Sequence, residues 1–456
     1  MFLSILQFEG AMELHAIVAA SVFTGVIVII MFEWLHLTVA ALLGALILVF
    51  AHVMTLSEAI GYISRSYATL ALFFGVMVLV RAFEPTKIFE YLAMQMVLIA
   101  KGSGKLLLLG IVAITTPICA VLPNATTVML LAPLIPPIAQ DIGVDFVPLL
   151  ILMVFVANSA GLLTLVGDPA TFIVGDSVNI TFTDYLKNLS LGGVLAVVSV
   201  VAIMPFLFSK IWQTKFENLE QIPHPKINHP RVLAVGGIIV LFVLIFFVIG
   251  EEALPIPIPP AAVALLGAAL ALLLAHQTKI DTVHNILRDV DWSTLLFFMS
   301  IFVLIGGLEK TGIVSNLSRL LAIILGQNIA LGAILLIFVV GILSSVVPNI
   351  PLVVAMVPLL KEYLVNVGYV GQNVLNNNFD GQLPPEVLPL FYAMMFGATL
   401  GGNGTLVGAS SNIVAAGISE QHGKVISFKT FLQYGIPVMG VQLLTSALYI
   451  TIFHLI

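Results

Sequence analysis

Long apolar runs alternate with short polar connections along this chain. The runs 16–32, 38–54, 232–250 and 261–275 are nearly free of charge, and each approaches the roughly 20 apolar residues with which a helix crosses a bilayer. The runs are continuous and do not alternate between apolar and polar positions, so they predict helices and exclude a membrane β-barrel. The pattern predicts about ten full crossings and two hydrophobic hairpins that do not cross.

The pattern occurs twice. Pro-Asn at 123–124 returns at 348–349, which is 225 positions later. Thr-Leu-Val-Gly at 164–167 returns at 405–408, which is 241 positions later, and the polar stretch 366–385 can hold the inserted residues. A very hydrophobic chain whose two halves share paired polar breaks is typical of a secondary transporter.

The repeat predicts how the chain is organised. We expect an N-terminal repeat at 1–208 with a hairpin near 115–140 and a broken helix near 156–175, a polar linker at 209–231, and a C-terminal repeat at 232–456 with a hairpin near 340–362 and a broken helix near 396–418. If each half crosses an odd number of times, the second half is inserted upside down, and this inverted arrangement is our prediction. The Lys and Arg residues of the linker favour a cytoplasmic position for it.

Composition restricts the class of protein. Hydrophobic residues make up 60% of the 456 residues and charged residues 9%, with a mean hydropathy of +1.15. No soluble domain of this size buries so much apolar surface. The net charge of −6 is thinly spread and gives no sign of a nucleic-acid partner, and the single cysteine excludes a disulfide framework and a cysteine metal site. The first segment lacks a basic region and a cleavage site, so we expect a retained helix.

The first pair of breaks lies at 122–127 and 344–351. Pro123 cannot continue a helix, and Asn124 and Thr126 are suitable caps for a helix that starts anew. Each break exposes carbonyl groups that attract a cation and N–H groups that attract an anion, because a helix end carries about half a unit charge.

The second pair of breaks lies at 156–175 and 396–417. Asp168 before Pro169 is a standard helix start, and three glycines between 401 and 404 favour unwound backbone. Polar and glycine residues in membrane helices also serve close packing or mark kinks, and this reading stays open for each residue alone. The matched set in both halves instead predicts four broken segments that converge on one site near the membrane midplane.

Candidate residues follow from these breaks. The expected ion- or solute-binding residues are Asn124, Thr126, Thr127, Asn158, Thr164, Gly167, Asp168, Asn349, Thr399, Asn403, Thr405, Ser410, Ser411 and Asn412. Sodium is expected near Asn124 and Asn349, and no other cofactor is expected. Candidate proton-coupling groups are Asp168 and the pair Glu84 and Glu309, which are 225 positions apart. The alternative for that pair is a place at the membrane interface, with Lys310 beside Glu309 and Arg81 one turn before Glu84.

The breaks carry a family resemblance. The segments 396–412, 415–423, 291–298 and 166–169 are similar to the ion transporter superfamily, which includes arsenite permeases, NhaD-type antiporters and divalent anion symporters, and most similar to its P protein-like permeases. The resemblance implies an all-α polytopic membrane protein of two inverted repeats, with re-entrant hairpins, broken transmembrane helices, sites at the hairpin tips and a homodimer with an elevator-like motion.

One departure from the resemblance affects the expected coupling. Symporters of the superfamily carry serine before the tip asparagine, and the P protein-like relatives carry aspartate, whereas this chain has Pro123 and Pro348. The hairpin tips therefore cannot supply a carboxylate that alternates between sodium and a proton.

These observations predict a secondary active transporter of a small inorganic ion or anion, driven by a sodium or proton gradient, in the bilayer of a bacterial inner membrane. A sodium/proton antiporter or arsenite efflux permease is the first alternative, and a passive anion channel is the second. We expect no enzyme, because the sequence contains no His-Glu-x-x-His motif, no Walker loop and no nucleophile elbow.

Overall fold

The chain is an all-α membrane protein, as the sequence predicted. The computed structural model describes residues 2–32, 34–216, 226–376, 379 and 381–455, and no strand occurs among them. Eight of the described helices are long and apolar enough to cross a membrane, or nine if the bent pair α18 and α19 counts as one span. The expected number was about ten. Two apolar helices, α2 and α21, are shorter than a usual span, with 14 residues each.

The helices of the first half are α1 (Phe2–Met31), α2 (Leu37–Phe50), α3 (Leu56–Arg65), α4 (Tyr67–Arg81), α5 (Ile88–Ala100), α6 (Gly104–Cys119), α7 (Asn124–Leu131), α8 (Ile135–Asp141), α9 (Phe146–Ala160), α10 (Pro169–Ser177), α11 (Phe182–Asn188), α12 (Ser190–Leu207) and α13 (Ser209–Trp212). Those of the second half are α14 (Pro230–Ile249), α15 (Pro260–Thr278), α16 (Val283–Arg288), α17 (Trp292–Lys310), α18 (Ile313–Leu325), α19 (Ile329–Ser344), α20 (Asn349–Asn366), α21 (Leu388–Gly401), α22 (Ser410–Gln421) and α23 (Phe428–Ile450).

The two halves pack through exchanged pairs of helices. Helix α4 of the first half packs on α15 of the second, and α17 of the second packs on α2 of the first. Likewise α7 packs on α22 and α20 packs on α10. By the sequence offsets α2 corresponds to α15, α4 to α17, α7 to α20 and α10 to α22, so each contact has its mirror in the other half. Reciprocal contacts of this kind are what a two-fold relation between similar units produces.

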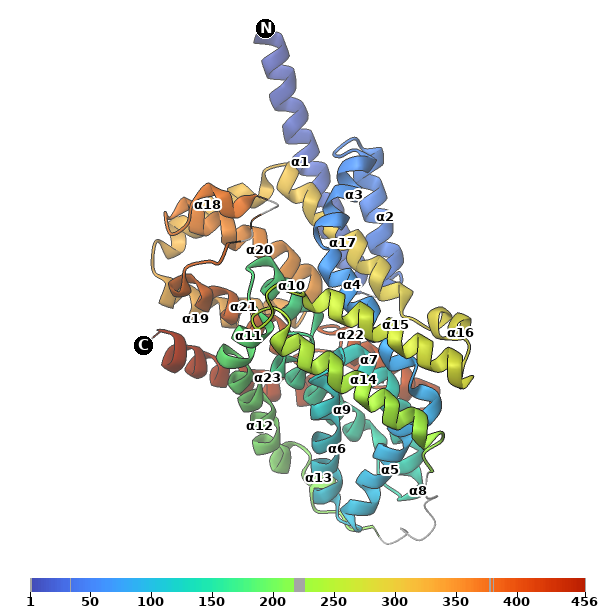
Figure 1. The fold of residues 1–456 in the computed structure, drawn as a ribbon. Coiled ribbons are helices and arrows are strands. Elements are labelled where there is room, and N and C mark those ends of the chain that lie inside the picture. The colour runs from blue at the N-terminus through green and yellow to red at the C-terminus, as the bar shows by residue number, and fades with distance from the viewer. Residues whose placement is uncertain (1, 33, 217–225, 377–378, 380, 456) are drawn as a thin grey trace.

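The molecule has two ends, which we call the linker face and the far face (Figure 1). At the linker face Arg81 at the end of α4 donates to Asp289 over 2.6 Å, and Ser103 forms a β-bridge with Lys215 of the linker. At the far face Lys310 at the end of α17 donates to Glu58 of α3 over 2.6 Å. Helices α8 and α13 lie at the linker face in Figure 1, and α3 and α18 lie at the far face.

The hairpin tips differ from the sequence prediction in one detail. Helix α6 ends at Cys119 and α7 begins at Asn124, but the N-cap of α7 is Pro123, in an extended conformation with φ −53° and ψ 139°. The prediction that Asn124 and Thr126 cap this helix was therefore wrong. Asn124 is the first helical residue: its side-chain oxygen accepts from the N–H of Ala125 over 2.8 Å, and its side-chain amide reaches another helix. Pro348 occupies the same position before α20.

Each hairpin tip is bonded to the break of its own half. The Thr164 hydroxyl donates to the carbonyl of Ala120 over 2.6 Å, and the Thr405 hydroxyl donates to the carbonyl of Ser345. The backbones approach so closely at this point that a Cβ on Gly167 would lie 2.6 Å from the carbonyl oxygen of Cys119. A side chain at this position would push the tip and the break apart.

We expect Gly167→Ala to lower the free energy of unfolding by about 1–3 kcal/mol, because the added methyl group overpacks rigid backbone. Thermal unfolding of the detergent-purified protein measures the effect. Gly440→Ala on α23 is the matched control, since a Cβ there meets no atom within 4 Å. Equal melting temperatures for the two variants would contradict the close approach.

Candidate functional site

Asn158, fully buried near the end of α9, is the centre of a network of neutral side chains. Its carbonyl oxygen accepts from the Asn124 amide over 3.0 Å and from the Ser411 hydroxyl over 2.6 Å. Its own amide donates to the side-chain oxygens of Asn403 over 2.9 Å and Asn412 over 3.1 Å. We call these five residues the amide cluster. It joins the first hairpin tip to both sides of the break between α21 and α22.

The amide cluster also holds unwound backbone in place. The Asn412 amide donates to the carbonyls of Gly402 and Thr405, each over 2.8 Å. These carbonyls belong to the glycine-rich segment that the sequence predicted to be unwound. In hydrocarbon such groups need partners from the protein itself, and Asn412 supplies them.

Sequence reasoning missed one member of the network, Gln442 of α23. Its side-chain oxygen accepts from the Asn403 amide over 2.8 Å, and its own amide donates to the Ser159 hydroxyl over 2.6 Å. The signal that could have found it is an uncharged amide inside the apolar run 428–450, because a polar residue in a membrane helix is usually bonded or functional.

Asp168 lies in a second cluster at the other hairpin tip. The Thr399 hydroxyl donates to its carboxylate over 2.5 Å, and the Asn349 amide lies 3.4 and 3.5 Å from its two oxygens. The same carboxylate caps α10 by accepting from the N–H of Ala170 over 3.4 Å. We call Asp168, Asn349 and Thr399 the carboxylate cluster. Its acid is fully buried, and no basic group of the described residues lies within 4.0 Å of it.

The two clusters are built from corresponding positions but carry different charge. Each contains a tip asparagine and a residue near the end of the helix before a break, Asn158 in one and Thr399 in the other. These two residues are 241 positions apart, as the repeat requires. The same offset places Ala409 opposite Asp168. One tip therefore faces only neutral groups, and the other faces a carboxylate.

The structure brings most of the predicted residues together and separates a few. Thr164, Thr405 and Gly167 shape the breaks and join no side-chain cluster, Thr126 is half-buried, and Ser410 is exposed. Thr127 is buried, and its hydroxyl has no partner among the described residues. The residues within the two clusters are Asn124, Asn158, Asp168, Asn349, Thr399, Asn403, Ser411 and Asn412.

The pair Glu84 and Glu309 lies outside both clusters. Glu84 is exposed and pairs with Arg81 at 3.2 Å, as the interfacial alternative predicted. Glu309 pairs with Arg65 at 3.8 Å, and the neighbouring Lys310 binds Glu58 instead. Both glutamates therefore have basic partners outside the clusters, as the alternative of a place at the membrane interface predicted.

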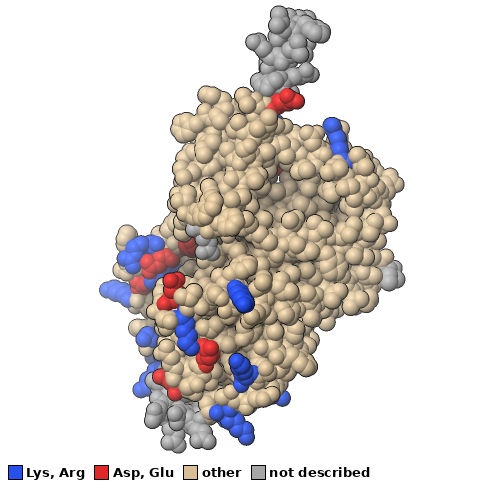
Figure 2. Space-filling view, turned by 180° about the vertical axis from the view of Figure 1, so that it is seen from behind, with Lys and Arg blue, Asp and Glu red and all other residues tan. Residues whose placement is uncertain are grey.

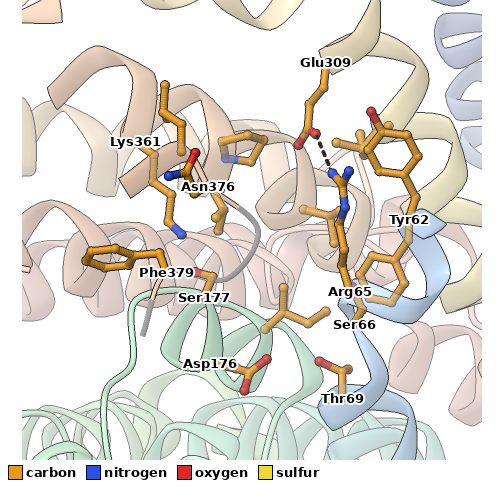
Figure 3. Close-up of a pocket in the computed structure, with 18 of the residues that line it drawn as sticks. Tyr62, Arg65, Ser66, Thr69, Asp176, Ser177, Glu309, Lys361, Asn376 and Phe379 are labelled. Atoms are coloured by element: carbon orange, nitrogen blue, oxygen red, sulfur yellow. Dashed lines mark ion pairs between the residues drawn. The ribbon is translucent and has the colours of Figure 1, made fainter. Parts of the chain in front are cut away.

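A cavity of about 420 Å³ opens at the far face (Figure 3). Its walls come from α3, α4 and α17 on one side and from α10 and α20 on the other. Ile173 and Val354 line it, five residues beyond Asp168 and Asn349. At 1.5 Å per helical residue the cavity ends roughly 7 Å from the carboxylate cluster.

Comparison of the sequence with known proteins places the chain in a family. A model described as "CitMHS: Citrate transporter" matches residues 27–376. The chain is 76% identical over 438 residues to the "Uncharacterized transporter slr0753" of Synechocystis, covering 96% of this chain and 97% of that protein. It is 31% identical to the "Uncharacterized transporter Rv2684" of Mycobacterium tuberculosis, covering 95% and 98%.

Two more distant proteins are also similar to this chain over most of its length. The human P protein is 27% identical over an alignment of 532 residues, which covers 98% of this chain and 61% of that protein. The crystal structure of the YdaH transporter of Alcanivorax borkumensis aligns with a TM-score of 0.60 over 86% of both chains, at 11% identity. At that identity the likeness concerns the fold alone.

We expect Gln442→Ala to lower the free energy of unfolding by about 1–3 kcal/mol, because it leaves the buried amide of Asn403 without an acceptor. Thermal unfolding in detergent measures this. Thr445→Ala on the same helix is the control, since the Thr445 hydroxyl bonds only to its own helix at Val441. An unchanged melting temperature for Gln442→Ala would contradict the hydrogen-bond network.

Proposed function

Since the chain belongs to the CitMHS citrate transporter family, and is a multi-pass membrane transporter, we propose that it is a secondary active carrier of a small anion that is driven by a sodium or proton gradient. The observation that carries this proposal is the carboxylate cluster. A single buried acid faces a hairpin tip, with neutral oxygen and amide groups around it and no basic partner among the described residues.

Asp168 suits the coupling cation. Its carboxylate and the Thr399 hydroxyl offer the hard oxygen ligands that sodium binds, a turn of the Asn349 amide would add a third, and the carboxylate alone can take up a proton. An ionised acid without a partner is costly in a low-dielectric interior. Binding of a cation removes that cost, so the cation-loaded site changes from one side of the membrane to the other more readily than the empty site does.

The amide cluster suits the anion. The start of α22 and the Asn124 amide present N–H donors, and a helix N-terminus carries partial positive charge. Oxyanions and carboxylates are bound by such donors. Citrate is the first solute to test, because the family model carries its name.

Sodium/proton exchange is the second candidate, and Asp168 favours it as well, because one carboxylate can bind either cation in turn. A passive channel is the third. Exchange would make an inward sodium gradient raise the internal pH, whereas a channel would let an anion equilibrate without accumulating above its external concentration.

We expect proteoliposomes with an inward sodium or proton gradient to accumulate radiolabelled citrate, phosphate or arsenite above its external concentration. An internal pH dye, recorded in parallel, detects proton exchange. Alkalinisation driven by sodium without any solute uptake would replace the carrier proposal with the exchange proposal. Equilibration without accumulation would favour the channel.

We expect Asn124→Ala, Asn349→Ala and Asp168→Asn each to reduce gradient-driven uptake at least tenfold while the protein still purifies as a folded species. The reason is that each variant removes a ligand from one of the two clusters. Asn228→Ala, an exposed position near the linker, is the matched control. Normal uptake by both asparagine variants would show that the hairpin tips do not bind the transported ions.

A further inference from the structure

Basic residues are distributed unevenly between the two faces (Figure 2). Contacts to α16, to the linker and to Asp145 place Arg81, Lys215 and Lys424 at the linker face. Nine more of the 17 Lys and Arg residues lie beside these contacts along the chain: Lys87, Lys101, Lys105, Lys210, Lys226, Arg231, Lys279, Arg288 and Lys429. The other five lie at the far face: Arg65, Lys187, Lys310, Arg319 and Lys361. Loops rich in Lys and Arg stay on the cytoplasmic side. The far face, and the cavity that opens there, then point away from the cytoplasm.

The cavity contains two opposite charges on adjacent half-helices. Figure 3 shows the Lys361 ammonium of α20 and the Asp176 carboxylate of α10 both directed into it, and α10 and α20 pack against each other. Among the described residues neither group has an ion-pair partner within 4.0 Å.

The other charged groups of the cavity already have partners. Arg65 pairs with Glu309 at 3.8 Å and lies over the ring of Tyr62 at 4.2 Å. Glu362 accepts from the hydroxyls of Ser315 over 2.8 Å and Ser318 over 3.2 Å. Lys361 and Asp176 are thus the charges in the described part of the cavity that are available to a ligand.

This pair exists in one half only. The repeat offsets place Pro136 opposite Lys361 and Gly417 opposite Asp176. The corresponding surface near the linker face therefore lacks both charges. Groups that served only helix packing or solubility would have no reason to be confined to the one face that holds the cavity.

We propose that this cavity is an external loading site, where the anionic solute binds Lys361 and the coupling cation binds Asp176 before both reach the inner clusters. The inference rests on the proposed carrier function and extends it, because two ions that load from the same face are moved in the same direction. Each bound ion also reduces the cost of holding the other in a partly dehydrated chamber.

Transport kinetics test the loading site in right-side-out vesicles. Lys361→Gln raises the external solute concentration for half-maximal uptake at least fivefold, measured with whichever of labelled citrate, phosphate or arsenite the wild type accumulates. Asp176→Asn raises the external sodium or proton concentration for half-maximal uptake at least fivefold. The controls are Lys310→Gln and Glu58→Gln, which remove charges from the same face outside the cavity. The Lys310 ammonium and Thr55 hold the pKa of Glu58 at about 2, so this control pair is charged at the assay pH.

Cysteine labelling tests the orientation without any transport. The chain has one native cysteine, Cys119, so the Cys119→Ala variant contains no cysteine that a maleimide could label. Asp176→Cys in this background reacts with a membrane-impermeant maleimide in intact cells, and the solute slows the reaction. Lys105→Cys at the linker face reacts only in everted vesicles.

Two results would overturn the loading site. One is labelling of Asp176→Cys from the cytoplasmic side alone, and the other is unaltered half-maximal concentrations in both charge variants while Asp168→Asn is inactive. In the second case the proposed carrier function stands. If the wild type accumulates none of the solutes, the carrier function fails and the loading site fails with it.

Discussion

The structure depends on one constraint, which is that a helix interrupted inside hydrocarbon must find new hydrogen-bond partners within the protein. Four interruptions meet here, and polar side chains of the chain itself supply the partners. Thr164 and Thr405 bind the carbonyl ends of the hairpin helices, and Asn412 binds the unwound segment before α22. Asn412 thus belongs both to the amide cluster and to the groups that stabilise a break, whereas Thr164 and Thr405 stabilise the breaks alone.

Much of this arrangement was predictable from the sequence, because a repeated pattern of apolar runs and polar breaks determines where helices stop. The breaks at Pro123 and Pro348 lie where the offset of 225 places them. Which side chains meet was not predictable. The contact of Asn158 with Asn403 and Asn412 joins residues more than 240 positions apart. Gln442 belongs to no sequence motif that would have marked it. Ser410 is exposed because of the way its side chain points at the start of α22, and the sequence alone does not reveal that direction.

The sequence repeat accounts for the helices around the site but not for the side chains within it. The two tips have the same backbone plan, yet Asp168 corresponds to Ala409 and Asn158 to Thr399. A symmetric ancestor would hold two equal sites. With a carboxylate in only one of them, the chain has a neutral position and an anionic one, which is the separation that the proposed binding of an anion and a cation at different positions requires. The two halves therefore share their helices and differ in the side chains that the breaks bring together.

The exchanged helix pairs have a consequence for biosynthesis. Helix α4 packs on α15 and α2 packs on α17, but these partners lie about 195 and about 255 residues apart along the chain. At 5–20 residues per second, the first half waits roughly 10 to 50 seconds in the membrane before its partners leave the ribosome. During that interval the surface of α4 at Gly75, where Ala264 of α15 later approaches closely, and the polar groups of the first hairpin face lipid or an insertion factor. The nascent chain at this stage should therefore depend on the membrane insertion machinery more than its hydrophobicity alone would suggest.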